Sequence, residues 1–193
     1  MFTVSKIIDA KKAIFTERDK ILFDCNILMY MFYTYGGYSK SLIRSYTTLF
    51  NNAIQNNSMI FIPSIEVSEF INTYCRQEYH RYLRQEGKSP SSFDFKHDYK
   101  ATQDYKDVIN EIHSIVNNQI LKIFHKLDDI FSEIDITSIY DKPNEFDFND
   151  RYYLKLAEKE GIKIITNDAD FYSDLGDVEV ITANRNLLCK NSV

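Results

Sequence analysis

The sequence has few cysteine, glycine and proline residues and no tryptophan. Its 3 cysteines, Cys25, Cys75 and Cys189, are an odd number and show neither a CxxC pair nor a zinc-type spacing. This argues against a disulfide framework or a structural zinc site and favours a reducing compartment. With only 5 Gly and 3 Pro among 193 residues, of which 44% are hydrophobic, the composition indicates a compact folded chain and argues against disorder or a repeat array.

The sequence also lacks long apolar runs and an excess of positive charge. No window approaches the roughly 18 apolar residues of a membrane helix, and residues 1–20 lack the hydrophobic stretch of a signal peptide. We therefore expect a cytoplasmic protein with no membrane association. The formal net charge of −5 offers no general attraction for nucleic acid. A polyanion would have to bind at a local basic patch or through bound cations.

Short apolar segments with strand character alternate with longer helical patterns. Because such strands usually form a parallel sheet with helices on both faces, we predict an α/β fold, a three-layer α/β/α sandwich with a central, mainly parallel sheet. Residues 132–137 alternate in period two and are a further candidate strand. The predicted strands span 21–24, 59–63, 162–168 and 178–182, and the predicted helices span 39–55, 64–86 and 150–160, the last ending at Gly161.

A long helical segment interrupts this alternation. Apolar residues recur at helical spacing from Val108 to Ile130, which predicts about six turns of amphipathic helix. A polar loop containing Gly87 and Pro90 precedes it. We expect residues 74–130 to form a helical hairpin that is an extension within a single domain of residues 1–193.

Four acidic residues stand at predicted strand ends or near helix starts. Asp24 lies within the apolar run KILFDCNILMYMF, where an unpaired buried carboxylate would cost several kcal/mol. Asp168 follows the third strand, Glu69 lies on the helix after the second strand, and Asp150 opens a later helix. Because ligands of open parallel sheets bind beyond the carboxyl ends of the strands, these four acids could converge.

Each acid also has a purely structural interpretation. Asp150 could be a charge favoured at a helix N-terminus, Glu69 could be solvated, and Asp168 and Asp170 could form a turn. Asp24 is the hardest to explain in this way, because apolar residues flank it on both sides. Taken together, the four placements favour a functional site.

The segments that carry these acids resemble the successive motifs of PIN-domain proteins, metal-dependent nucleases with an α/β/α sandwich fold. The family pattern has an acid followed two residues later by Asn or Ser, a Glu on the helix after the second strand, an Asp seven residues before an Ala, and a closing Thr-x-Asp. The matching segments are ILFDCNILMYMF, IPSIEVSEFIN and DFNDRYYLKLAEKEGIKIITNDADF, in which Asp24 with Asn26, Glu69, Asp150 with Ala157, and Thr166 with Asp168 follow this order.

The resemblance implies roles for these residues. Crowded carboxylates repel one another unless divalent cations neutralise them, and a set of oxygen ligands favours Mg²⁺ or Mn²⁺ over zinc. Glu66 and Asp147 are alternative acids, although the register favours Glu69 and Asp150. The implied catalytic residues and metal ligands are Asp24, Glu69, Asp150 and Asp168, supported by Asn26, Thr166 and Asp170.

We therefore expect a divalent-metal-dependent endonuclease that hydrolyses phosphodiester bonds. The resemblance is nearest to toxin-like, VapC-type members and implies a single-stranded endoribonuclease of toxin–antitoxin or defence type. Its partners would be an RNA substrate, a cognate antitoxin or other inhibitory protein, and a second copy of the chain in a homodimer. Two alternatives stay open: a structure-selective nuclease that processes DNA or RNA, and a catalytically silent scaffold that binds proteins through the hairpin.

Basic residues interleaved with aromatic ones suggest where RNA would bind. Arg76, Arg81 and Arg84 lie in such a stretch, and Arg151 stands beside Asp150. The alternative for the stretch is an ordinary solvated surface, because acidic residues dilute its charge.

Overall fold

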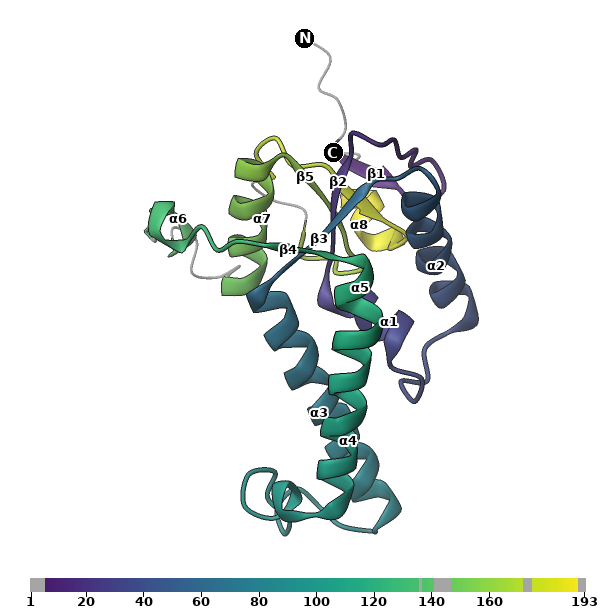
Figure 1. Cartoon of the computed structure of the whole chain (residues 1–193), viewed down its shortest axis with the longest axis vertical. Coiled ribbons are helices and arrows are strands. Elements are labelled where there is room, and N and C mark those ends of the chain that lie inside the picture. The colour runs from purple at the N-terminus through teal and green to yellow at the C-terminus, as the bar shows by residue number, and fades with distance from the viewer. Residues whose placement is uncertain (1–5, 136, 141–146, 172–174, 191–193) are drawn as a thin grey trace.

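A six-stranded parallel sheet forms the centre of the computed structural model, which describes residues 6–135, 137–140, 147–171 and 175–190 (Figure 1). The strand order is β1-β6-β5-β2-β3-β4, and every pair of neighbours runs parallel. The connection from β2 leads to β3 on one side, while β5 lies on the other, so the strand order reverses at β2. The strands are β1 (Ile7–Asp9), β2 (Lys20–Phe23), β3 (Met59–Pro63), β4 (His125–Leu127), β5 (Ile162–Ile165) and β6 (Val180–Thr182).

Helices cover both faces of this sheet. Ile21 and Phe23 of β2 pack in one core cluster with residues of α1 and α2, whereas Leu22 packs in a second cluster with residues of α7 and α8. This alternation confirms the predicted α/β/α sandwich. The helices are α1 (Cys25–Phe32), α2 (Lys40–Gln55), α3 (Ser64–Gln85), α4 (Gln103–Ile115), α5 (Leu121–Ile123), α6 (Thr137–Tyr140), α7 (Phe148–Glu160) and α8 (Arg185–Lys190).

Local sequence signals set several helix ends. The Ser39 hydroxyl accepts a hydrogen bond from the backbone N–H of Leu42 (3.3 Å) and caps α2. Asp147 caps α7 in the same way, accepting from the N–H of Asn149 (2.8 Å), so this helix begins two residues before the predicted start. Gly161 ends α7 with a φ of 65°, a left-handed conformation that glycine adopts readily.

The helix predicted up to Ile130 is wrong beyond Ile123. After α4, a π-helical turn (Val116–Ile120) and α5, the chain becomes extended, and β4 pairs with β3 at the edge of the sheet. Phe124 anchors this change of direction, because its ring stacks on Phe50 at 5.8 Å. Backbone pairing with an existing strand therefore overrides the helical periodicity.

The strand predicted at 132–137 is also wrong within the described residues. Phe131–Glu133 form a 3₁₀ turn and α6 begins at Thr137, while residue 136 lies outside the described part of the chain. The Asp135 carboxylate accepts from the N–H of Thr137 (3.0 Å), a local hydrogen bond that favours a turn over a strand.

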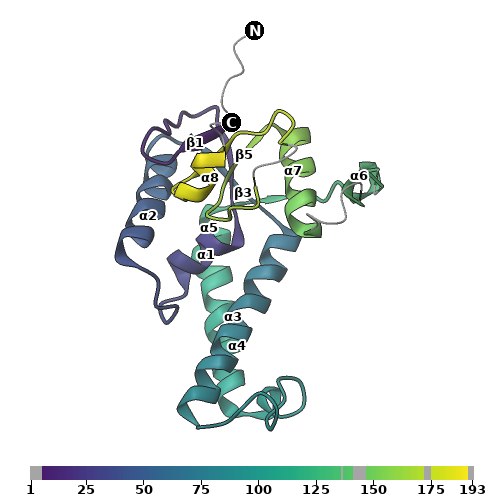
Figure 2. The same ribbon diagram turned by 180° about the vertical axis from the view of Figure 1, so that it is seen from behind.

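Two helices leave the sheet together. α3 and α4 lie side by side, run in opposite directions and reach well beyond the sheet (Figures 1 and 2). Near the far end, Tyr79 and Tyr99 are buried in a small core of their own. Among the helices of the described residues, none is both long enough and apolar enough to cross a membrane.

Candidate active site

The carboxyl ends of β2 and β5 bring two of the predicted acids together. Asp24 directly follows β2, and its N–H donates to the carbonyl of Ile165, the last residue of β5 (3.0 Å). Asp168 lies three residues beyond that point. Because the strand order reverses at β2, this position is where an open parallel sheet leaves room for a ligand.

A cleft of about 330 Å³ opens at the carboxyl ends of these strands. All four predicted acids, Asp24, Glu69, Asp150 and Asp168, line it, and they come from four different segments of the chain. Asp170 is exposed and does not contribute to the lining. The other lining residues are Cys25, Asn26, Met29, Tyr30, Tyr38, Thr73 and Asp147.

Thr166 and Asn26 hold the acids on the sheet side of the cleft. The buried Thr166 hydroxyl donates to Asp24 Oδ2 (2.5 Å) and accepts from the N–H of Asp168 (2.9 Å). Asn26 Nδ2 donates to the same Asp24 oxygen, and Asn26 Oδ1 accepts from the N–H of Asn167 (3.1 Å). The two supporting residues predicted from the sequence thus connect the acid after β2 to the acid after β5.

Two residues that were not predicted hold Glu69. Asn149 Nδ2 and the Tyr153 hydroxyl donate to the same oxygen, Glu69 Oε2, at 2.9 and 3.0 Å. The other oxygen, Oε1, receives no hydrogen bond from the described residues. Asn149 and Tyr153 are four residues apart on α7 and so share a face, and that spacing beside Asp150 was the available signal in the sequence.

The cleft raises the pKa values of two of its acids, Asp24 and Asp150. Burial, reinforced by the charges of Glu69 and Asp168, raises the pKa of Asp24 to about 7 even though the Thr166 hydrogen bond opposes the rise. Burial also raises the pKa of Asp150 to about 8, together with the charges of Asp24 and other nearby acids. Each carboxylate therefore makes ionisation of its neighbours more costly.

Glu66 adds a sixth carboxyl group, next to the five that line the cleft. Its side chain is fully buried, and neither of its oxygens has a hydrogen-bond partner among the described residues. Burial, followed by the charges of Asp24 and Glu69, raises its pKa well above the usual range. The sequence suggested Glu66 as an alternative to Glu69, whereas the structure places Glu69 in the lining and Glu66 behind it.

The donor set fits a hard divalent cation. Every acidic group at the cleft offers carboxylate oxygens, the ligands that Mg²⁺ and Mn²⁺ prefer, and the buried oxygens of Glu66 nearby have no hydrogen-bond partner among the described residues. Across the described ranges, no three acidic, histidine or cysteine side chains are arranged to hold one ion as they stand. An ion would therefore be held partly through water or after side-chain adjustment, in the manner usual for Mg²⁺.

The arginines predicted to contact substrate lie outside the cleft lining. Arg81 forms a short ion pair with the buried Glu78 (2.5 Å) and lies 3.5 Å from Asp104. Arg76 stacks over the ring of Phe95, with 4.0 Å from its guanidinium carbon to the ring centroid. Arg84 is exposed near the end of α3, and Arg151 is half-buried on α7 beside Asp150.

The aromatic residues near these arginines pack against one another. Tyr82 and Phe93 stack at 5.7 Å, and Lys88 covers the Phe93 ring at 4.0 Å. Tyr79 and Tyr99 are 5.4 Å apart in the small core at the end of the hairpin. Their faces already have partners within the chain, so the geometry gives no support to a base-stacking surface here.

The family model for the PIN domain matches residues 21–173, most of the chain. A search of curated proteins finds no match. Among solved structures, the chain is similar to PAE2754 from Pyrobaculum aerophilum, with 13% sequence identity, a TM-score of 0.42 and 91% of each chain covered.

Proposed function

The chain belongs to the PIN-domain family, and from that premise we propose that it is a divalent-metal-dependent endoribonuclease acting on single strands. Proteins of this family are generally nucleases that use ions such as Mg²⁺ or Mn²⁺ and act on nucleic acid. We further propose a single domain in which the helices within residues 74–130 form an extension, up to Ile123, after which the chain turns into β4. The observation that carries the proposal is the convergence of Asp24, Glu69, Asp150 and Asp168 on one cleft.

A purely structural role explains this cleft poorly. Asp24 is 5% exposed and Glu66 fully buried, and the charge of Asp24 helps to raise the pKa of Glu66. Placing repelling carboxyl groups together lowers stability unless a cation joins them. Function is the usual reason for such an arrangement.

The residues of the cleft would have two roles in hydrolysis, holding the metal ion and positioning its ligands. A bound Mg²⁺ or Mn²⁺ supplies Lewis-acid activation of the phosphodiester and of water. Asp24, Glu69, Asp150 and Asp168 would hold it. Thr166, Asn26, Asn149 and Tyr153 would fix the carboxylates through the hydrogen bonds described above, as outer-shell groups of metal sites do.

The wall of the cleft favours a single strand. Tyr30 and Tyr38 line it, their rings meeting edge to face at 4.6 Å, and Tyr38 is only half-buried. An unpaired base could stack on such a wall, whereas a base within a duplex is already stacked. The toxin–antitoxin role, an inhibitory partner and a homodimer rest on the resemblance of the motifs to toxin-like members.

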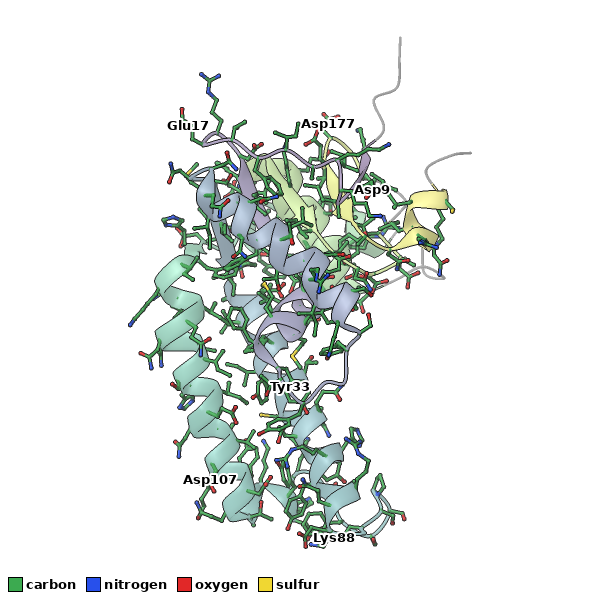
Figure 3. The ribbon with its side chains drawn as sticks, turned by 90° about the vertical axis from the view of Figure 1, so that its right-hand side faces the viewer. Asp9, Glu17, Tyr33, Lys88, Asp107 and Asp177 are labelled. Carbon is green, nitrogen blue, oxygen red and sulfur yellow. The ribbon has the colours of Figure 1, made fainter. Side chains whose placement is uncertain are left out.

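A cleavage assay tests the proposal. Labelled single-stranded RNA and DNA are incubated with Mg²⁺, Mn²⁺ or EDTA and with wild type, Asp150→Asn or the control Asp107→Asn. Asp107 is exposed on α4, toward the far end of the hairpin (Figure 3). We expect RNA cleavage that requires metal, is lost in Asp150→Asn and persists in Asp107→Asn.

Other outcomes would count against this function. Cleavage confined to DNA would favour the structure-selective nuclease. Absence of cleavage by a folded wild type under every condition would favour the silent scaffold.

A further inference from the structure

A second cleft, of about 540 Å³, lies at the carboxyl ends of the strands, as the acidic cleft does. It opens beyond the carboxyl ends of β1 and β6, with α2 on one side and the start of α8 on the other. In Figure 3, α2 faces the viewer and α8 lies to its right, and Asp9 is labelled at the end of β1. Because all six strands run parallel, their carboxyl ends lie on the same side of the sheet, and both clefts lie there next to each other.

The second cleft is basic. Its lining includes Lys11, Arg44 and Arg185, opposed by one carboxylate, Asp9, whose Oδ1 already accepts from the backbone N–H of Lys11 (2.9 Å). Within the described ranges, none of these three cationic side chains forms an ion pair or a hydrogen bond, and all three are exposed. The hydroxyls of Ser41 and Thr48 also line the cleft.

Such a lining suits phosphate groups. Arginine and lysine bind phosphate oxygens through charge-assisted hydrogen bonds, and serine and threonine hydroxyls add further donors. In a chain of net charge −5, acidic neighbours would be expected to pair with such cations, yet no described residue does so for these three.

One layer of side chains separates it from the acidic cleft. Tyr38 lines the acidic cleft, and the next residue, Ser39, lines the basic one. The Tyr46 hydroxyl donates to Asn167 Oδ1 (2.9 Å) and accepts from the N–H of Ala183 (3.0 Å), which also lines the basic cleft. Asn167 itself lies between Thr166 and Asp168, so the shared wall directly adjoins the acids.

We propose that the basic cleft binds backbone phosphates of the single-stranded substrate, on one side of the bond to be cut. This inference rests on the proposed nuclease function. A cleft lined by carboxylates repels a nucleic-acid backbone, so affinity has to come from cations nearby. A strand leaving the acidic cleft past Tyr30 and Tyr38 meets Arg44 and Arg185 next.

Binding measurements without cleavage test this proposal. Fluorescence anisotropy of a labelled single-stranded RNA is recorded in EDTA for wild type, Arg44→Glu, Arg185→Glu and the control Arg18→Glu, an exposed arginine before β2. We expect the first two variants to bind about tenfold more weakly and the control to stay within about twofold of wild type. Circular dichroism checks that each variant is folded.

Neutral variants give a second readout that misfolding would not produce. Replacing Arg44 or Arg185 by Ala should lower the slope of log K against log salt concentration by about 0.7 each, the value for one phosphate contact on a single strand. Two sets of oligonucleotides, each extended on a different side of the bond to be cut, test on which side the basic cleft binds the strand. Only one of the two sets should lose affinity in Arg44→Ala, because the basic cleft lies on one side of the acids.

The outcomes separate this proposal from the proposed function. Unchanged affinity and slope in the Arg44 and Arg185 variants would overturn the basic cleft as a strand site even if wild type cleaves RNA. Strand binding that depends on both arginines, in a wild type that never cleaves, would support the cleft and refute the nuclease. Equal, arginine-dependent binding of a poly-glutamate peptide would instead assign the cleft to an acidic protein.

Discussion

The stability of the metal-free protein should fall as the pH rises from about 4 to 8, because Asp24 and Asp150 have to ionise in a buried site. Burial raises its pKa from 3.8 to about 7. A group whose pKa is higher in the folded than in the unfolded state favours folding while it is protonated. Its contribution is complete below about pH 4 and is lost as the pH passes through about 7.

The magnitude follows from the size of this pKa change. A rise from 3.8 to about 7 corresponds to roughly 4 kcal/mol of the free energy of unfolding. Asp150, with a pKa of about 8, shares the same repulsion, so the two contributions do not add. We expect a total loss of about 2–4 kcal/mol, or about 5–15 °C in Tm for a chain of this size.

Thermal unfolding followed by circular dichroism, in EDTA across this pH range, measures the effect. Asp24→Asn should give a flatter profile and a more stable protein at high pH, because the amide does not ionise and its oxygen can still accept from Thr166. Mn²⁺ should restore stability to wild type at high pH. Parallel profiles for wild type and Asp24→Asn, or stability that rises with pH throughout, would refute the reasoning.

Three further substitutions test the roles of Tyr153 and of the arginines on α3. Tyr153→Phe removes the hydrogen bond to Glu69 and should cost about 1 kcal/mol in urea unfolding while weakening Mn²⁺ binding; unchanged Mn²⁺ affinity would show that Tyr153 does not position Glu69. Arg81→Ala leaves the buried Glu78 unpaired and should cost about 2–4 kcal/mol, whereas Arg84→Ala should stay within about 0.5 kcal/mol. A stable Arg81→Ala protein that loses RNA binding would instead make Arg81 a substrate contact.

The fold could largely be read from local patterns. β3 has the predicted bounds, and Gly161 ends α7 where its conformational freedom indicated. Apolar strands alternating with helices were sufficient for the parallel sheet, because few other arrangements bury such segments on both sides. The convergence of the four acids followed from the same topology, while their catalytic role stays a prediction.

Features that depend on distant pairing could not be predicted. β1 and β4 are three-residue edge strands with no pattern of their own, and β4 exists because β3 offers an edge to pair with. The basic cleft joins Lys11, Arg44 and Arg185, which are far apart in the sequence. No local spacing indicates that such residues share a cleft, since the sheet order and the packing of α2 bring them together.

Calorimetric titration with Mn²⁺ tests the central claim most directly. If the acids of the cleft form a metal site, wild type and Asp107→Asn should bind Mn²⁺ saturably, and Asp24→Asn and Asp150→Asn should lose most of the affinity. The claim would be contradicted if folded wild type gave no binding, or if all four proteins bound Mn²⁺ alike.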